Sequence, residues 1–483
     1  MMPLLRMDLG GTPPTDTGEC LLALWLMSDV QVLDAASPAR CEWVELLADT
    51  PKWQPLLHMH RPYEALTHWA LAAHVDKVRR DPCAPHSRRP YDLALSLGDN
   101  IDNAQHNELE TFLAILAGGN TRLPAWGSMQ DASGWDGATP WPYWCPDPRV
   151  DDTWKHRGYP AIPDFLARAG APLHAPGLGF AWASVPGNHD LMRQGTALPE
   201  PGIEAIAAGA RKQLARPQGF DPVDPLAWFV EAPAAFSHGG SRTVTPLTGR
   251  RAVDRQAWIA AHVARGAAGF GAASIAQSQA DAVIDTPHAR ILLLDTNHPQ
   301  GDFEGSVGRA QLDWLEARLS EVDHTPDRFA VLASHHGAVS LTNTRGDDPQ
   351  RQQAEALTAL LHRHPSLVAW LVGHRHLHEV RAHPGPCGGF WEISTGAVID
   401  WPVQTRAVEF TRHRDGQFGI TCTLQDHGAA ADSPAGWHHA LARRFAGAQA
   451  PRMQGAAGDR DVQLILPRRT RPAAAGTGSA CRP

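Results

Sequence analysis

Five short polar clusters follow apolar runs of the sequence, and they hold the side chains best suited to chemistry. The candidate metal ligands in these clusters are Asp29, Gln31, Asp99, Asn188, His335, His374 and His376. All of them offer an oxygen or an imidazole nitrogen, a donor set that suits divalent metals such as Mn, Fe or Zn. Two cations about 3.5–4 Å apart repel each other unless a shared anion lies between them. Asp99 is our candidate for that bridging carboxylate.

The apolar runs before these clusters are short and continuous, which is typical of buried strands. We expect strands at residues 21–27, 91–97, 181–185, 289–294, 329–333, 367–372, 390–394, 407–413 and 418–424. Amphipathic spacing predicts helices near residues 63–79, 307–319, 350–361 and 436–445. This alternation indicates an α/β fold. Because ligands in such folds gather beyond the carboxyl ends of strands, we expect the polar clusters to form one site.

Two long insertions interrupt the alternation, at about residues 103–180 and 191–288. The first holds Trp135, Trp141, Trp144 and Trp154, which either form a stacking wall for a flat substrate group or pack on one another. Cys145, in the same stretch, is expected to be buried. We place one domain at residues 20–425. Residues 426–483 are expected to form a C-terminal helix and a mobile tail, with an apolar patch at 462–466.

The charge balance narrows the classes of partner. Lys and Arg number 43 against 51 Asp and Glu, a formal charge of −8 over 483 residues. This balance gives no general attraction for nucleic acid or for an anionic membrane surface. The apolar run at residues 21–27 is shorter than the roughly 20 residues of a membrane span. Because no basic segment precedes it as in a secretion signal, we expect a cytoplasmic protein. The scattered cysteines suggest neither a disulfide framework nor a zinc knuckle.

The ordered motifs resemble those of the calcineurin-like metallophosphoesterase superfamily, whose pattern is D-x-[H/Q], GDxxD, GNH[E/D], a strand-end His and GHxH. They stand here as Asp29-Val30-Gln31, Gly98-Asp99-Asn100-Ile101-Asp102, Gly187-Asn188-His189-Asp190, His335-His336 and Gly373-His374-Arg375-His376. The sequence segments SDVQVLDAASPAR and RPYEAL also resemble those of a bacterial subgroup with long insertions. The resemblance implies a four-layered αββα sandwich, two divalent metal ions and a small-molecule phosphoester or diphosphate substrate.

The resemblance also implies a role for individual residues. It places metal one between Asp29, Gln31, Asp99 and His376. It places metal two between Asp99, Asn188, His335 and His374. His189 corresponds to the family's histidine that acts as an acid or contacts phosphate, and Asp102 would orient the imidazole of His189.

Other residues near the motifs have weaker assignments. Asn188 and Arg375 would contact the substrate phosphate, although Arg375 could equally form a structural salt bridge. His336 is an alternative ligand to His335, and Asp190 is expected to brace its turn. We expect the following residues to be solvated: His378, Glu379 and His383.

The activity implied is metal-dependent hydrolysis of a phosphomonoester, phosphodiester or pyrophosphate bond, with a metal-bridging hydroxide as the nucleophile. Most members of the superfamily carry His where this chain has Gln31. The D-x-Q variant resembles the ADP-ribose and CDP-alcohol pyrophosphatases, which makes a nucleotide-sugar or nucleotide-alcohol diphosphatase the alternative. If Gln31 leaves metal one empty, the chain would instead be a catalytically silent metal-binding module.

Overall fold

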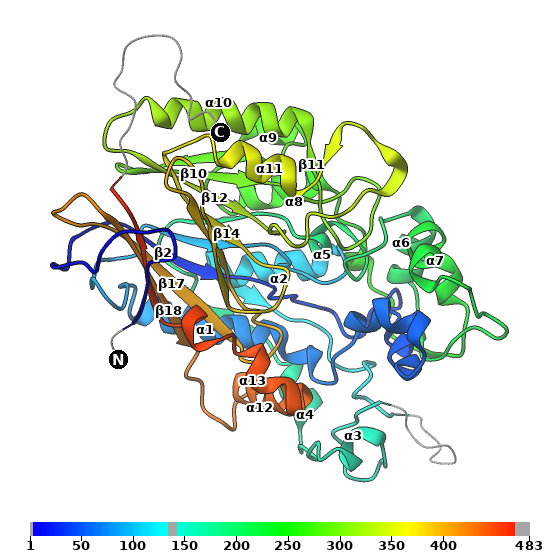
Figure 1. Ribbon diagram of the computed structural model, residues 1–483. Helices are drawn as coiled ribbons and strands as arrows, with labels where there is room; N and C mark the ends of the chain where they lie inside the picture. The colour runs from blue at the N-terminus through cyan, green and yellow to red at the C-terminus, as the bar shows by residue number, and fades with distance from the viewer. Residues whose placement is uncertain (1–2, 134–142, 469–483) are drawn as a thin grey trace.

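Two β-sheets pack face to face at the centre of the computed structural model, which describes residues 3–133 and 143–468 (Figure 1). The first sheet contains, in spatial order, β1 (Leu4–Arg6), β19 (Val462–Leu466), β18 (Phe418–Asp426), β17 (Gln404–Arg412), β2 (Glu19–Met27), β3 (Leu93–Ser96) and β6 (Trp182–Ser184). The second contains β15 (Glu379–His383), β16 (Phe390–Ser394), β14 (Leu367–Val372), β12 (Phe329–Ser334), β10 (Ala289–Leu294) and β9 (Ala282–Asp285).

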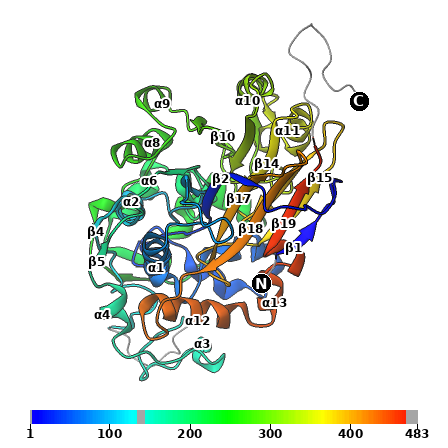
Figure 2. The ribbon, with the colours of Figure 1, turned by 90° about the vertical axis from the view of Figure 1, so that its left-hand side faces the viewer.

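Helices cover the outer face of each sheet. Figure 2 shows α1 (Thr67–Arg80) and α12 (Pro434–Ala446) on one side of the sandwich, with α10 (Arg309–Asp323) and α11 (Ala354–Leu361) on the other. Helix α2 (His106–Ala117) also packs on the first sheet. These four layers confirm the predicted αββα sandwich.

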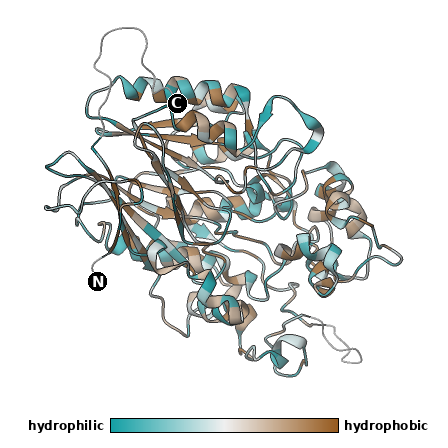
Figure 3. Cartoon of the chain, viewed as in Figure 1, coloured by the Kyte–Doolittle hydropathy of each residue, from teal (hydrophilic) through white to brown (hydrophobic). Residues whose placement is uncertain are grey.

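The alternation of side chains along β2 explains the layering. Successive residues of a strand point to opposite faces of its sheet. Leu24 therefore lies in the apolar cluster between the two sheets, whereas Trp25 lies in the cluster beneath α1 and α12. Both side chains are buried, and the hydrophobic strands appear in brown at the centre of Figure 3. Burial on both faces accounts for the continuous apolar runs of the sequence.

The parallel pairing of the central strands positions the site. β2 pairs in parallel with β3, and β3 with β6. In the second sheet, β10 pairs in parallel with β12, and β12 with β14. Because parallel strands end at the same edge of a sheet, the loops that carry the predicted clusters emerge together.

Shorter elements lie mainly within the two insertions. The helices are α3 (Thr153–His156), α4 (Phe165–Ala169), α5 (Asn188–Leu191), α6 (Pro201–Ala208), α7 (Pro225–Glu231), α8 (Arg255–Ala264), α9 (Ala272–Gln277) and, nearer the C-terminus, α13 (Ala450–Met453). The strands are β4 (Gly119–Thr121), β5 (Leu173–Ala175), β7 (Arg211–Gln213), β8 (Ser241–Thr243), β11 (Val307–Gly308) and β13 (Arg351–Gln352). The second insertion also supplies β9, an edge strand of the second sheet.

The first sheet extends beyond the predicted domain of residues 20–425. The strands β1 and β19 lie outside those bounds, pair in parallel with each other, and join the sheet through β18. The apolar patch at 462–466 is thus a sheet strand, and α13 precedes it. Cys387 is disulfide-bonded, which the scattered cysteines did not predict. Among the described residues, the helices are all too short or too polar to cross a bilayer.

Trp144 and Trp154 of the first insertion pack in the protein interior, whereas Trp126 is 48% exposed. Trp144 is edge-to-face with Phe165, with ring centroids 5.0 Å apart, and Trp154 lies 5.3 Å from Tyr159 in the same way. Both tryptophans are buried, so the stacking-wall interpretation is wrong for them. Trp135 and Trp141 lie outside the described residues. Cys145 is buried, as expected.

Candidate metal centre

The predicted ligands converge at the carboxyl ends of β2, β3, β6, β12 and β14. The Nε2 atom of His335 lies 3.0 Å from Asn188 Oδ1 and 3.3 Å from Asp99 Oδ2. His374 Nδ1 lies 3.3 Å from the same His335 nitrogen. Ligand atoms of Asp29, Asp99 and His335 all lie within 4.8 Å of one another. Residues that are far apart in the sequence therefore meet in one small volume.

The remaining two predicted ligands border the same volume. His376 Nε2 lies 3.2 Å from Asp29 Oδ1. The backbone N–H of Gln31 donates to the carbonyl of Asp99 at 2.9 Å, which joins the first two motifs. The Gln31 side chain is buried, and its Oε1 accepts no hydrogen bond. An unpaired buried oxygen is costly, and a bound cation would satisfy it.

Five of the predicted ligands have a left-handed backbone conformation. The φ angles are +49° at Asp29, +46° at Gln31, +53° at Asp99, +67° at His374 and +53° at His376. Positive φ is uncommon for residues other than glycine and costs roughly 1–3 kcal/mol each. Such strain gathers at functional sites, where it aims side chains that regular structure would point elsewhere. Positive φ also occurs at other loop residues, such as Arg88 and Ser278, but it recurs in the three motifs that carry these five residues.

The hydrogen bonds of His335 test whether the site fits a metal. Its Nδ1 lies 2.8 Å from the carbonyl of Leu97 and must donate, because a carbonyl only accepts. Burial disfavours the charged ring, but Asp99 outweighs burial and raises the pKa of His335 to about 9, so the metal-free ring carries a proton on Nε2 that faces the oxygens of Asn188 and Asp99. A divalent cation would take the place of that proton and leave the lone pair of Nε2 facing the same oxygens. Several acceptors that point at one another repel unless a cation lies among them. The donor set of oxygens and imidazole nitrogens therefore fits a divalent cation.

The charge of Asp99 depends on its histidine neighbours. Burial opposes ionisation of its carboxyl, but the charges of His335 and His189 outweigh it and hold the pKa of Asp99 well below its usual range. Its Oδ1 accepts a hydrogen bond of 2.8 Å from the backbone N–H of His189. Asp99 Oδ2 thus faces His335, and the backbone of the GNHD motif holds Oδ1. The ligand atoms of Asp29 and Asp99 also lie within 4.8 Å of each other, so Asp99 lies between residues of both predicted ligand sets.

His336 is engaged on both ring nitrogens. Its Nδ1 lies 2.8 Å from Thr296 Oγ1, and its Nε2 lies 3.0 Å from the carbonyl of Phe303. Burial lowers the pKa of this ring to about 3, and the charge of His335 adds to the effect. The geometry favours His335 over His336 as the ligand, although His336 lies close to His335 and His374.

His189 is oriented by Asp102, as the motif comparison predicts. His189 Nδ1 lies 3.0 Å from Asp102 Oδ1 and 3.1 Å from the carbonyl of Asp102. Both partners are buried. A Cβ atom added at Gly195 would lie 2.4 Å from His189 Nε2 and 2.5 Å from Asn188 Nδ2, so these two atoms are near each other. Asp190 Oδ2 accepts from the N–H of Gly187 at 2.8 Å and braces the turn.

Asp400 is a functional candidate that the sequence analysis missed. Its Oδ2 accepts a 2.7 Å hydrogen bond from His376 Nδ1, which leaves His376 Nε2 facing Asp29. A metal-binding histidine commonly donates its second nitrogen to a carboxylate in this way. Asp400 is held by Arg61 and by the Tyr63 hydroxyl. The sequence does contain an indication of this residue, because Asp400 directly follows the apolar run 397–399, as the predicted ligands follow theirs.

Arg375 is exposed at the rim of the site, beside Glu304. Burial raises the pKa of Glu304 to about 7, Asp302 adds to the effect, and Arg375 opposes it.

The expectation of solvation is wrong for His378, which is buried and whose Nδ1 accepts from the N–H of Gly396. It is also wrong for His383, whose Nε2 is 2.6 Å from Glu392 and whose ring stacks on Phe390.

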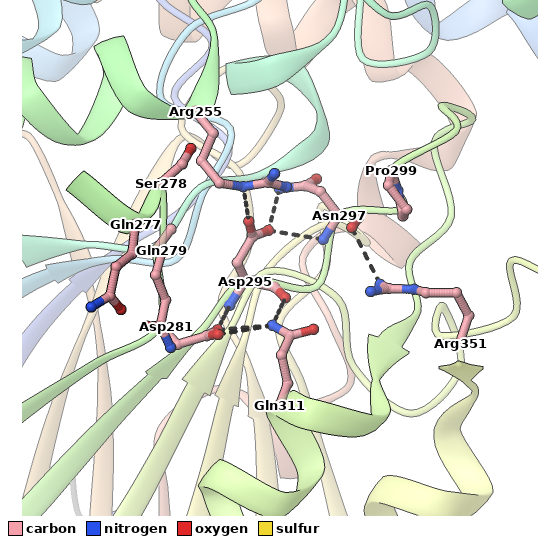
Figure 4. Close-up of a pocket in the computed structure, with 11 residues that line it drawn as sticks. Arg255, Gln277, Ser278, Gln279, Asp281, Asp295, Asn297, Pro299, Gln311 and Arg351 are labelled. Atoms are coloured by element: carbon pink, nitrogen blue, oxygen red, sulfur yellow. Dashed lines mark hydrogen bonds and ion pairs between the residues drawn. The ribbon is translucent and has the colours of Figure 1, made fainter. Parts of the chain in front are cut away.

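A separate polar cavity of about 360 Å³ opens at the carboxyl end of β10 (Figure 4). Asp295 lies in it between Arg255, at 2.7 Å, and the side-chain amide of Asn297, at 2.9 Å. Asn297 Nδ2 is also 3.2 Å from the carbonyl of Pro186, which precedes the GNHD motif. The residues that line the cavity include none of the predicted ligands. Its acidic and basic groups largely neutralise one another.

Two curated proteins are similar to part of the chain. No family model matches the chain. A probable cyclic nucleotide phosphodiesterase of Synechococcus sp. (strain WH7803) is 34% identical over 87 residues, which is 18% of this chain and 32% of the relative. A glycerophosphodiester phosphodiesterase of Enterobacter lignolyticus (strain SCF1) is 32% identical over 93 residues, 19% of this chain and 32% of that protein. The chain thus spans about a third of the length of these relatives.

Among solved structures, a dimetal phosphatase from Danio rerio is similar, with a TM-score of 0.41 and 14% sequence identity. The similarity covers 85% of this chain and 97% of the zebrafish chain.

Proposed function

We propose that the chain is a metal-dependent phosphoester hydrolase of the calcineurin-like metallophosphoesterase type, a proposal that its motifs and its two partial relatives support. The observation that carries this proposal is the convergence of buried acceptor atoms around His335 Nε2, together with the unpaired Gln31 Oε1. The printed names of both relatives make a phosphodiester the first substrate to test.

The proposed ligand sets follow the motifs. Metal one would be held by Asp29, Gln31, Asp99 and His376, and metal two by Asp99, Asn188, His335 and His374. When bound, the two divalent cations would lower the pKa of a shared water towards neutrality and attract the charge of the phosphoryl oxygens.

The chain's own residues would supply orientation and a proton. Asp102 holds His189 Nδ1, so Nε2 is the nitrogen that would donate to the leaving oxygen or hold the phosphate. Asn188 Nδ2 donates one hydrogen to the carbonyl of Gly195 at 2.9 Å and keeps a second one for a phosphoryl oxygen. At the exposed rim, the guanidinium of Arg375 would contact the same phosphate.

Gln31 supports a second candidate within the same chemistry. An amide oxygen is a weaker donor to transition metals than an imidazole nitrogen, so metal one would be bound less tightly here than where a histidine stands. The D-x-Q motif resembles that of nucleotide-sugar and nucleotide-alcohol diphosphatases, whose substrates carry two phosphates. A pyrophosphate bond would be the preferred target in that case.

We expect purified protein loaded with Mn²⁺ to hydrolyse bis-p-nitrophenyl phosphate, to lose this turnover with a chelator, and to regain it when Mn²⁺ is restored. Parallel assays with p-nitrophenyl phosphate and ADP-ribose would rank the monoester, diester and diphosphate candidates. A fully metal-loaded protein that turned over none of these three would contradict the enzyme proposal and favour the silent metal-binding module.

A further inference from the structure

A buried network of ion pairs lies behind His189. Arg40 is 1% exposed, and its guanidinium contacts three carboxylates. Its Nε donates to Glu42 at 2.8 Å, one terminal nitrogen donates to Glu64 at 2.9 Å, and the other contacts Asp102. Burial opposes ionisation of Asp102, but Arg40 outweighs it and lowers the pKa of Asp102 to about 2. Arg40 therefore keeps charged the carboxylate that orients His189.

A second buried arginine lies behind His376. Arg61 Nε donates to Asp400 Oδ1 at 2.8 Å, and a terminal nitrogen of Arg61 donates to Asp400 Oδ2 at 2.9 Å. This two-point pairing fixes the plane of the carboxylate. Burial again opposes ionisation, and Arg61 and His376 hold the pKa of Asp400 well below its usual range. The His376 ring is thus oriented by the same device that orients His189.

Glu64 joins these two arrangements. Its Oε2 accepts a hydrogen bond of 2.9 Å from Arg40 and another of 2.9 Å from the backbone N–H of Arg61. Its Oε1 lies 3.1 Å from His60 Nδ1, and the side chain is only 1% exposed. One oxygen atom therefore fixes both the guanidinium that holds Asp102 and the backbone of the residue that holds Asp400.

We propose that Glu64 is a positioning residue that couples the orientation of His189 to that of His376, and so couples proton donation to binding at metal one. The coupling rests on the proposed function, because it assigns these histidines to the acid and to metal one. The physical cause is the balance of ion pairs around a buried charge: without the Glu64 carboxylate, Arg40 keeps only Glu42 and Asp102 and shifts towards them. A shift of Arg40 or of the Arg61 backbone would turn one of the two rings.

Glu64→Gln tests the coupling, since it keeps the size of the side chain and removes its charge. Two properties are measured against the wild type. One is the Mn²⁺ affinity, from the metal retained during titration. The other is the ratio of turnover of methyl p-nitrophenyl phosphate to turnover of methyl phenyl phosphate. The first ester releases p-nitrophenolate, a good leaving group, whereas the phenolate of the second depends more on protonation by a general acid. Loss of carboxylate support for a metal-binding histidine costs about 10–100-fold. Because Glu64→Gln leaves Asp400 in place, we expect Mn²⁺ affinity to weaken by about tenfold, at the lower end of that range, and turnover of the phenyl ester to fall by more than turnover of the nitrophenyl ester.

Glu409→Gln is the matched control. Glu409 is likewise 1% exposed, and its carboxylate accepts from the backbone N–H groups of His86 and Ser87 at 2.9 and 2.7 Å. We expect this variant to keep both wild-type values. If Glu64→Gln does not fold, Arg40→Lys decides the question, because it keeps the charge but loses the planar fork that reaches Asp102. It should alter the leaving-group ratio and, through Glu64, also weaken Mn²⁺ affinity, by less than Glu64→Gln does.

The inference is overturned if Glu64→Gln behaves as Glu409→Gln does, or if it changes only one of the two properties. It is also overturned if Glu64→Gln is unfolded and Arg40→Lys has a wild-type leaving-group ratio. Failure of the proposed function looks different, because wild-type protein would then bind Mn²⁺ without turning over either ester.

Discussion

Asp99→Ala is expected to release bound metal and to lower kcat/KM by about 1000-fold or more, which corresponds to roughly 4 kcal/mol of transition-state stabilisation. The Asp99 carboxylate is buried, and its oxygens face both His335, at 3.3 Å, and the backbone of His189, at 2.8 Å. No other residue is assigned to both metal sites. Its removal would leave two cations without the anion that offsets their repulsion.

The measurement is metal content per chain after gel filtration, together with hydrolysis of bis-p-nitrophenyl phosphate. Asp99→Asn is the matched variant, because its amide oxygen still accepts from the His189 N–H but carries no charge. We expect it to lose metal as well. Full metal retention in both variants would show that Asp99 is not a ligand.

His189→Ala is expected to retain both metals and to lose about 10²–10⁴-fold in turnover, the usual contribution of a positioned general acid. His189 belongs to neither proposed ligand set. Its Nδ1 is committed to Asp102, while its Nε2 lies near Asn188 Nδ2. Loss of this ring would therefore remove a proton donor or phosphate contact and leave the cation cage intact.

A buried histidine outside the site controls for this substitution. His68 lies on α1 and is 1% exposed, so His68→Ala removes a similar buried ring and should leave turnover near the wild-type value. Loss of metal from His189→Ala would mean that His189 is itself a ligand. Wild-type turnover in His189→Ala would mean that the acid lies elsewhere.

The sequence predicted those parts of the fold and site that local pattern determines. The strands β10, β14 and β16 have the predicted bounds, because each is an uninterrupted apolar run. The predicted ligands also meet in space, since each directly follows such a strand and parallel strands end together. Their roles as ligands stay predictions until metal is measured.

The parts of the fold and site that the sequence did not predict depend on contacts between distant segments. The short strand β1 has no periodic signal, and it is a strand only because β19, near the other end of the chain, pairs with it. In the same way, Arg61 gives no local indication that its partner is Asp400. Trp144 and Trp154 were ambiguous because an aromatic-rich stretch has the same composition whether it lines a site or fills a core.

The most direct test of the metal centre is anomalous scattering from crystals grown with Mn²⁺. We predict two manganese peaks about 3.5–4 Å apart, with Asp99 between them, one peak beside Gln31 and His376 and the other beside Asn188 and His335. Peaks absent from this pocket, or found only at other residues, would contradict the account.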